Sequence, residues 1–305
     1  MAKSGFSSYS GTQVNAVRGA ANIGTDDGLV YLPPGFAVAG ISSEIASPTR
    51  LQTRQDTQRM SPEVDGFWLQ NNSSGADLIG GVGLRIANRH WNAGQWDDSG
   101  ATAILQYIED TTDAQDRDSV DDFSWLCAAD DDGFAIGSEI PWGWLTMDID
   151  TENSANAATL FEYWDQSGAW ALPAATSVKM SELIVSAGKT GTGETTYVWD
   201  PAQDWGKSGE TYAGSVLASP NSAMPTGMYW ARFRIDGADV SAGNITASAI
   251  EIGIHSLVEN IDDESTASRG PNLNLYSPFC DAVVFINSLY GTGNLSYYVT
   301  ARARG

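Results

Sequence analysis

The chain has 305 residues, 42% of them apolar, and its 38 acidic against 16 basic residues give a formal net charge of −22. An apolar share of this size supports a buried core and excludes wholesale disorder. A strongly negative field disfavours direct binding to nucleic acid or to an anionic membrane, so we expect neither as a partner.

The N-terminal region, residues 1–65, is rich in Ser, Thr, Gln, Ala and Gly and contains one short strand-and-turn patch at 28–41. It predicts an extended N-terminal arm with a small β patch. Within it, residues 47–60 carry Arg50, Arg54 and Arg59 against one acid. A basic stretch on an acidic chain indicates an anchoring arm that docks on an acidic neighbour. The alternative is a solvated loop or helix turn.

Strand signals follow closely from residue 66 onward. Alternating or short apolar runs bounded by turn residues predict strands within 66–71, 77–88, 101–110, 123–128, 130–138 and 142–150. Residues 244–258 have a clear period of two and predict another strand. The last two apolar segments, on either side of the GTGN sequence at 291–294, predict a terminal hairpin.

These signals together predict an all-β fold, an antiparallel, jelly-roll-like β-sandwich with little helix. We expect three parts: the arm at 1–65, the sandwich at 66–240, and C-terminal strands at 241–305. The last part either completes the sandwich or forms a small second β unit. The start of the chain lacks the apolar core of a signal peptide, and no apolar run is long enough to span a bilayer.

Five short motifs carry a family resemblance. They are DTTDAQDRDSVDDF at 110–123, DDDGFAIGSEIPW at 130–142, EYWDQSGAWALP at 162–173, VWDPAQDW at 198–205 and YWARFRI at 229–235. In order and approximate spacing they resemble a β-sandwich domain found in structural proteins of tailed viruses. The resemblance covers less than half of the chain. It departs from the family pattern at an extra residue in QSGAW and at a Gly/Ser/Ala-rich insertion, residues 206–227.

The resemblance implies a virion structural protein, expected as a capsid-surface decoration or turret component that stabilises the particle or presents a surface. The alternative in the same class is a tail or baseplate component, including a receptor-binding one. Implied partners are the major capsid protein or other virion proteins and further copies of this chain as a homo-oligomer. Assembly in the host cytoplasm and a glycan on the host surface as candidate ligand follow from the same resemblance. A secreted carbohydrate-binding module is the alternative from a different class.

Candidate ligand-binding residues are aromatic or acidic. Trp91, Trp96 and Trp142 lie near turns and could form a platform for a sugar; core packing is the alternative reading. The acids Asp130, Asp131 and Asp132 suggest a structural cation such as calcium, although the ligand spacing of a calcium loop is absent. No other cofactor is expected.

Catalytic motifs are missing from the sequence. The two histidines, His90 and His255, have no partner at metal-ligand spacing, and no nucleophile elbow or phosphate-binding loop occurs. We therefore predict no catalytic residues and no enzymatic activity. Cys127 and Cys280 lie far apart in apolar contexts and are expected as buried free thiols.

The last motif also contains two arginines in alternation. Arg232 and Arg234 are separated by one residue in a predicted strand, so they should share one face. We expect both to be exposed to solvent, with a buried pair to a carboxylate as the alternative.

Overall fold

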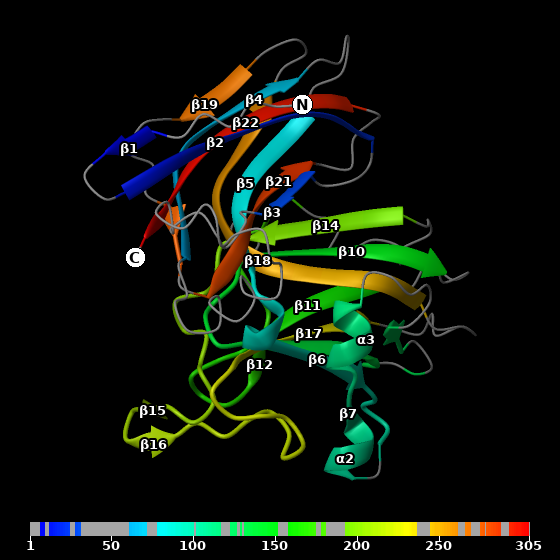
Figure 1. Cartoon of the computed structure of the whole chain (residues 1–305). Coiled ribbons are helices and arrows are strands. Elements are labelled where there is room, and N and C mark those ends of the chain that lie inside the picture. Colours follow the sequence, from blue (N-terminus) through cyan, green and yellow to red (C-terminus); the bar gives the residue numbers. More distant parts are fainter. Residues whose placement is uncertain are drawn as a thin grey trace, which may run out of the picture. The chain divides into compact units, whose positions relative to one another are not determined.

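A computed structural model of the chain describes residues 7–9, 12–24, 28–31, 61–71, 78–100, 102–116, 123–126, 129, 131–151, 158–174, 178–180, 193–236, 245–261, 266–269, 275–277, 279–287 and 293–304. The chain divides into two compact units. Unit 1 consists of Met1–Ala87 and Gly253–Gly305, and unit 2 consists of Asn88–Ile252 (Figure 1). The described residues are mostly antiparallel strands with very little helix, which confirms the all-β, sandwich-like fold.

Unit 1 contains two antiparallel sheets. Its first sheet runs β1 (Ser7–Tyr9), β2 (Thr12–Gly24), β22 (Gly293–Arg304), β4 (Ser61–Asn71) and β19 (Thr266–Arg269), with β20 (Leu275–Tyr276) also paired to β4. Its second sheet runs residues 253–261 of β18 (Ile245–Ile261), then β5 (Leu78–Ile86), β21 (Cys280–Asn287) and β3 (Gly28–Tyr31). The two ends of the chain are therefore neighbours in one sheet.

The pairing in unit 1 corrects two expectations. Residues 12–24 are not an arm, because β2 pairs with β22 from Val14 opposite Arg302 to Asn22 opposite Asn294. The predicted terminal hairpin is also wrong: β21 pairs with β5 and β3, whereas β22 pairs with β2 and β4. A turn signal between two strands marks a reversal of the chain but does not fix which strands become hydrogen-bonded neighbours.

The observed division also differs from the boundaries expected at residues 65 and 240. Residues 245–252 of β18 belong to unit 2, where the strand pairs with β8, so this segment does complete the central sandwich. The remaining C-terminal strands pair with strands from the N-terminal 87 residues to build unit 1. Long-range strand pairing decides this arrangement, and local composition carries little information about it.

Unit 2 contains two sheets and a small ribbon. The first, here called the β17 sheet, runs β12 (Trp170–Ala171), β11 (Ala158–Trp164), β17 (Tyr229–Asp236), β9 (Gly133–Ser138), β6 (Trp91–Trp96) and β7 (Tyr107–Glu109). The second, here called the β10 sheet, runs β13 (Val178–Met180), β14 (Gly193–Trp199), β10 (Trp144–Thr151) and residues 245–252 of β18, with β8 (Phe123–Trp125) also paired to β18. A small ribbon, β15 (Thr211–Tyr212) with β16 (Ser215–Val216), completes the strands.

Helix in unit 2 is limited to single turns. They are η1 (Asn88–His90), α2 (Ala103–Gln106) and α3 (Thr111–Gln115). The strand expected across 101–110 is therefore correct only at its end, in β7. The preceding residues turn into α2 because the amides of Leu105 and Gln106 both donate to the carbonyl of Thr102, each at 2.9 Å. No described helix is long and apolar enough to cross a membrane.

The core of unit 2 is an aromatic layer between the two sheets. Phe134 and Phe233, neighbours on β9 and β17, stack with centroids 4.7 Å apart. From the facing β10 sheet, Trp199 contacts Phe161 at 4.5 Å and Trp125 contacts Phe134 at 5.0 Å. Rings from both sheets thus interdigitate in the way that defines a β-sandwich.

Candidate functional site

The five motifs of the resemblance all fall in unit 2. The first contributes α3 and the first residue of β8, the second β9, the third β11 and β12, the fourth the end of β14, and the fifth β17. Four of the five motifs supply elements that belong to or pack on the β17 sheet. The face of this sheet opposite the aromatic core is the most chemically distinctive surface among the described residues.

Strand alternation builds this second face. On β17, Trp230, Arg232 and Arg234 alternate with Ala231 and Phe233, whose side chains face the core. Glu162 on β11 lies directly opposite Arg232. Strand alternation therefore places apolar side chains in the core and charged side chains on the opposite face of the β17 sheet.

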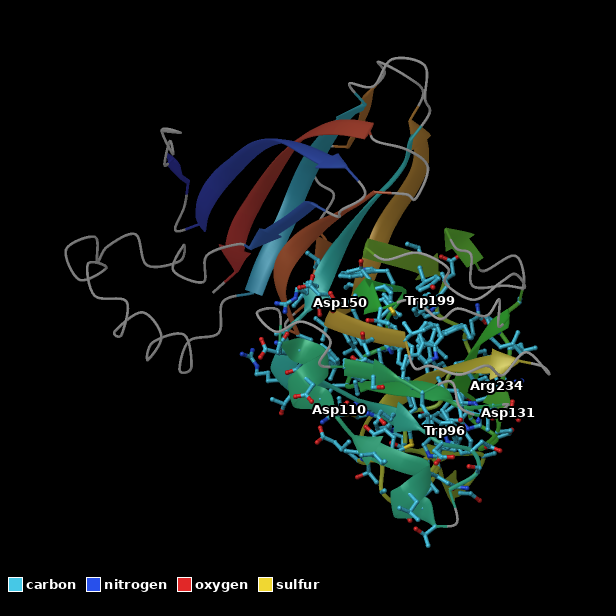
Figure 2. All side chains as sticks on the ribbon, turned by 90° about the vertical axis from the view of Figure 1, so that its right-hand side faces the viewer. Trp96, Asp110, Asp131, Asp150, Trp199 and Arg234 are labelled. Carbon is cyan, nitrogen blue, oxygen red and sulfur yellow. The ribbon has the colours of Figure 1, made fainter. Side chains whose placement is uncertain are left out.

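An ion-pair network occupies the centre of the face. Glu162 Oε2 lies 2.6 Å from Arg232 Nε and 3.0 Å from Arg234 Nε. Arg234 also pairs with Asp131, and Figure 2 labels these two residues. The side chains of Arg232, Arg234 and Glu162 are only 11%, 15% and 9% exposed. The expected solvent exposure of both arginines is thus wrong. The ion pairs with the Glu162 carboxylate on the neighbouring strand offset the cost of removing both guanidinium groups from water.

Burial has an electrostatic consequence for Arg232. Desolvation lowers the pKa of its guanidinium, and the neighbouring Glu162 carboxylate opposes that change. Arg232 keeps its charge in either case, because arginine is not deprotonated in proteins. The site therefore contains a fixed positive charge.

Tryptophans surround Arg232. Its guanidinium carbon lies 4.8 Å from the ring centroid of Trp170 and 5.4 Å from that of Trp96. Trp170 also meets Trp164 edge to face at 5.2 Å. Trp96 is buried, whereas Trp164 and Trp170 are partly exposed. The arrangement is a cation held in an aromatic frame that opens to solvent on the side of the Trp164–Trp170 hairpin.

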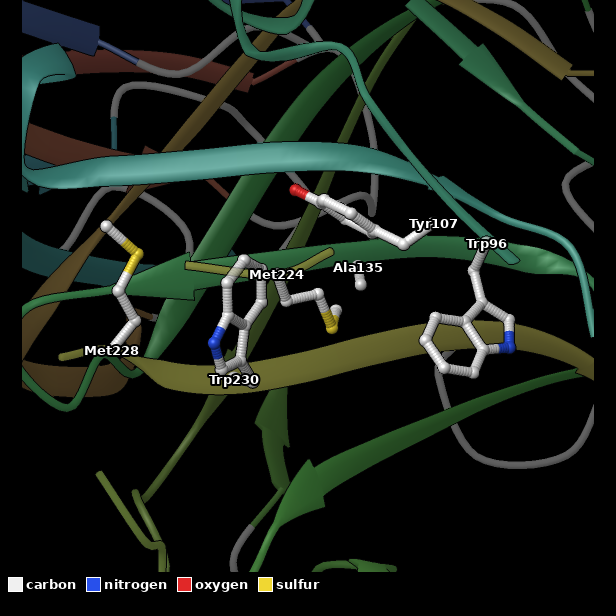
Figure 3. Close-up of a cluster of buried hydrophobic side chains, with 6 residues drawn as sticks. All are labelled: Trp96, Tyr107, Ala135, Met224, Met228 and Trp230. Carbon is white, nitrogen blue, oxygen red and sulfur yellow. The ribbon is translucent and has the colours of Figure 1, made fainter. Parts of the chain in front are cut away.

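A hydrophobic cluster adjoins this frame. Its six buried residues are Trp96, Tyr107, Ala135, Met224, Met228 and Trp230 (Figure 3). Met224 belongs to the insertion at 206–227, so the insertion contributes directly to the interior of unit 2. Burial raises the pKa of Tyr107 above its usual value, with further contributions from Glu109 and Asp110.

The insertion is a folded part of unit 2. Ser208 and Met228 exchange hydrogen bonds, the Asn221 side chain donates to Gln106 at 3.2 Å, and Trp164 Nε1 donates to the Ala218 carbonyl at 3.0 Å. Small polar residues can satisfy nearby backbone groups in this way. The insertion therefore packs on part of the second face, against Trp164 and Trp230.

The predicted aromatic platform does not exist as an exposed surface. Trp91, Trp96 and Trp142 are only 2%, 5% and 0% exposed. Trp91 and Trp96 are five positions apart on β6 and so face opposite sides of the sheet, while Trp142 packs on Trp199 at 4.9 Å. Among the tryptophans of unit 2, Trp164 and Trp170 are instead the ones that are partly exposed. These two tryptophans stand on either side of the DQSGA turn, and this is the feature of the sequence that could have indicated their exposure.

The predicted acidic cation site is divided between different partners. Asp131 pairs with Arg234, and the buried Asp132 accepts hydrogen bonds from the amides of Ala129 (2.6 Å) and Asp98 (3.2 Å). Asp130 lies outside the described residues. Within the described part of the chain, no group of three or more His, Cys, Asp or Glu side chains could hold a metal ion.

Other expectations fall partly or wholly outside the described residues. Arg50, Arg54 and Arg59, the predicted anchoring arm, are not described, and neither is Cys127. Cys280 is a buried free thiol, as expected.

The acidic first motif packs against β6. Thr111 Oγ1 accepts a hydrogen bond from the amide of Ala93 (3.0 Å) and donates to its carbonyl (3.1 Å), which docks α3 on the strand. Burial, supported by a hydrogen bond with Asp113, raises the pKa of Asp110 to about 6, although Gln95 opposes the shift. This motif therefore holds α3 in position on β6.

No protein-family model matches this sequence, and no curated protein matches it either. The resemblance to structural proteins of tailed viruses accordingly rests on the five motifs.

Proposed function

We propose that this chain is a structural protein of a tailed-virus particle, a capsid-surface decoration or turret component without enzymatic activity. The observation that supports it is the convergence of the five motifs on one folded unit. They keep the order of the viral β-sandwich domain, and each contributes an element of unit 2.

The role would be mechanical. A sandwich with an aromatic core is a rigid body, and it would bury area against the major capsid protein, other virion proteins or further copies of itself. Symmetry would multiply weak contacts into strong attachment. We propose Arg50, Arg54 and Arg59 as the anchor to an acidic neighbour. No cofactor is needed for this role.

Two alternatives have different support. A tail or baseplate position, including receptor binding, shares the resemblance but differs in copy number. A secreted carbohydrate-binding module is favoured by one specific observation, the partly exposed Trp164 and Trp170 beside Arg232.

The anchor is tested by changing Arg50, Arg54 and Arg59 together to Gln and measuring incorporation into purified particles. The proposal predicts a large loss of incorporation with an unchanged melting temperature. Arg89→Gln, which alters an exposed arginine of unit 2, is the control and should incorporate normally. Full occupancy of the triple variant would overturn the anchor. Cryo-microscopy of the same particles distinguishes capsid from tail, and finding the chain only at the tail tip would favour the tail alternative.

A further inference from the structure

Arg232 has hydrogen-bonding capacity that its neighbours leave unused. Its Nε donates to Glu162, and none of the described residues accepts a hydrogen bond from its two terminal nitrogens. These nitrogens are not among the buried atoms that lack a partner, so they retain contact with solvent. A guanidinium fixed by Nε therefore presents its two terminal donors as a fork.

The aromatic surroundings fix the orientation of this fork. Trp170 and Trp96 lie against the guanidinium at 4.8 and 5.4 Å, which restrains it without occupying its donors. Trp164 and Trp170, partly exposed and nearly perpendicular at 69°, extend the surface beyond the charge. A ligand that reaches Arg232 thus also meets two indole rings.

We propose that Arg232 with Trp164 and Trp170 forms a binding site for the carboxylate of an acidic saccharide. The fork matches a carboxylate in bidentate geometry, and an indole face suits the C–H face of a sugar ring. This inference goes beyond the structural role proposed above and does not depend on it.

Charge and shape together favour a carboxylate over other anions. A net charge of −22 repels a doubly charged phosphate monoester more strongly than a singly charged carboxylate. A sulfate ester carries the same single charge as a carboxylate, but the planar carboxylate matches the planar fork of Arg232 better. The local network of Arg232, Arg234, Glu162 and Asp131 is formally neutral, so the site adds little long-range attraction. Each site should therefore bind in the millimolar range, and useful avidity would come from many copies.

Binding to the full-length protein is measured by saturation-transfer NMR and by tryptophan fluorescence. The probes are digalacturonic acid, its dimethyl ester, galactose 6-sulfate and acetyl-dialanine. The proposal predicts saturable binding of the diacid and binding weaker by about tenfold or more for the ester, which keeps the sugar but loses the charge.

Two variants and one control locate the site. Arg232→Lys keeps the charge beside Glu162 but removes the fork, and Trp164→Leu removes one indole; each should weaken digalacturonate binding by about tenfold. Arg89→Lys, at an exposed position outside this face, should bind as the parent does. Near-ultraviolet circular dichroism shows whether each variant retains the parent fold.

Several results would overturn the assignment. Equal binding of acid and ester, or unchanged binding by a folded Arg232→Lys, would remove Arg232 from the site. Equal binding of acetyl-dialanine would exclude a saccharide as the specific ligand, and tighter binding of the sulfate ester would exclude a carboxylate. An absence of saturable binding by the diacid in the millimolar range would refute the site altogether.

Discussion

The indole N–H of Trp205 donates a buried hydrogen bond of 2.8 Å to the backbone carbonyl of Trp230. The backbone of Trp205 also forms a bridge with Asp165 in the β11–β12 hairpin. A single residue thus joins the third, fourth and fifth motifs, which are separated along the chain. The third, fourth and fifth motifs are therefore parts of one packing unit.

Changing Trp205 to Phe should destabilise unit 2 by about 2–4 kcal/mol, because the change leaves a buried carbonyl without this donor and opens a cavity. Urea unfolding followed by tryptophan fluorescence checks this, since ten of the eleven tryptophans lie in unit 2. Trp164→Phe also removes an indole donor, but at a partly exposed position. It should cost less than about 1 kcal/mol. Similar costs for both variants would contradict the proposed importance of the Trp205 bond.

Glu162→Gln should cost about 3 kcal/mol of unfolding free energy, because Arg232 and Arg234 would remain buried without their shared anion. The matched control is Glu210→Gln, whose side chain is 54% exposed and lies 4.0 Å from Lys207. Exposed pairs contribute little, so its effect should stay below about 0.5 kcal/mol. Chemical denaturation of both variants measures the difference. A neutral Glu162→Gln would mean that the network does not stabilise the fold.

Gly133→Ala should be strongly destabilising, by about 3 kcal/mol, because the new Cβ would lie 1.8 Å from the carbonyl oxygen of Phe233 on the paired strand. Gly214→Ala is the comparison: its φ of 88° is unfavourable for alanine, but nothing lies within 4 Å of the added carbon. It should cost about 1 kcal/mol. Thermal melting of both variants tests whether close strand approach, rather than backbone angle, requires glycine at 133.

Asp110 should make stability fall as pH rises. Its pKa is raised from 3.8 to about 6 in the folded protein, mainly by burial, so the folded state binds more protons than the unfolded chain between these values. The free energy of unfolding should therefore decrease from pH 4 to pH 6 through this group. Asp110→Asn cannot ionise and should reduce this decrease, whereas Asp98→Asn, on an exposed turn, should retain it. Chemical denaturation at several pH values measures the free energy of unfolding of each variant. If it changes with pH in the same way for Asp110→Asn and the parent, Asp110 is not the source of the pH dependence.

The all-β fold was predictable because the alternation of apolar and polar residues can be recognised within each strand segment by itself. The segment expected at 244–258 illustrates this: its residues 245–258 lie within β18. Strand partners were not predictable, because the choice between a local hairpin and distant neighbours depends on the whole sheet. For this reason β2 and β22, from opposite ends of the chain, pair against expectation.

The second face was predictable only in part. Alternation correctly gave Arg232 and Arg234 a common side, but their burial depends on Glu162, seventy and seventy-two positions away in the chain. The insertion at 206–227 resembled a plain Gly/Ser-rich loop, yet Met224 anchors it in the core. The insertion packs on Trp96, Trp164 and Trp230, and so the exposure of these three tryptophans could not be read from strand periodicity.

Copy number in purified virus particles tests the proposed function most directly. Quantitative mass spectrometry would compare peptides of this chain with those of the major capsid protein in the same particles. A capsid decoration predicts a fixed ratio corresponding to on the order of hundreds of copies per particle. Absence from particles that are otherwise complete would contradict a virion role.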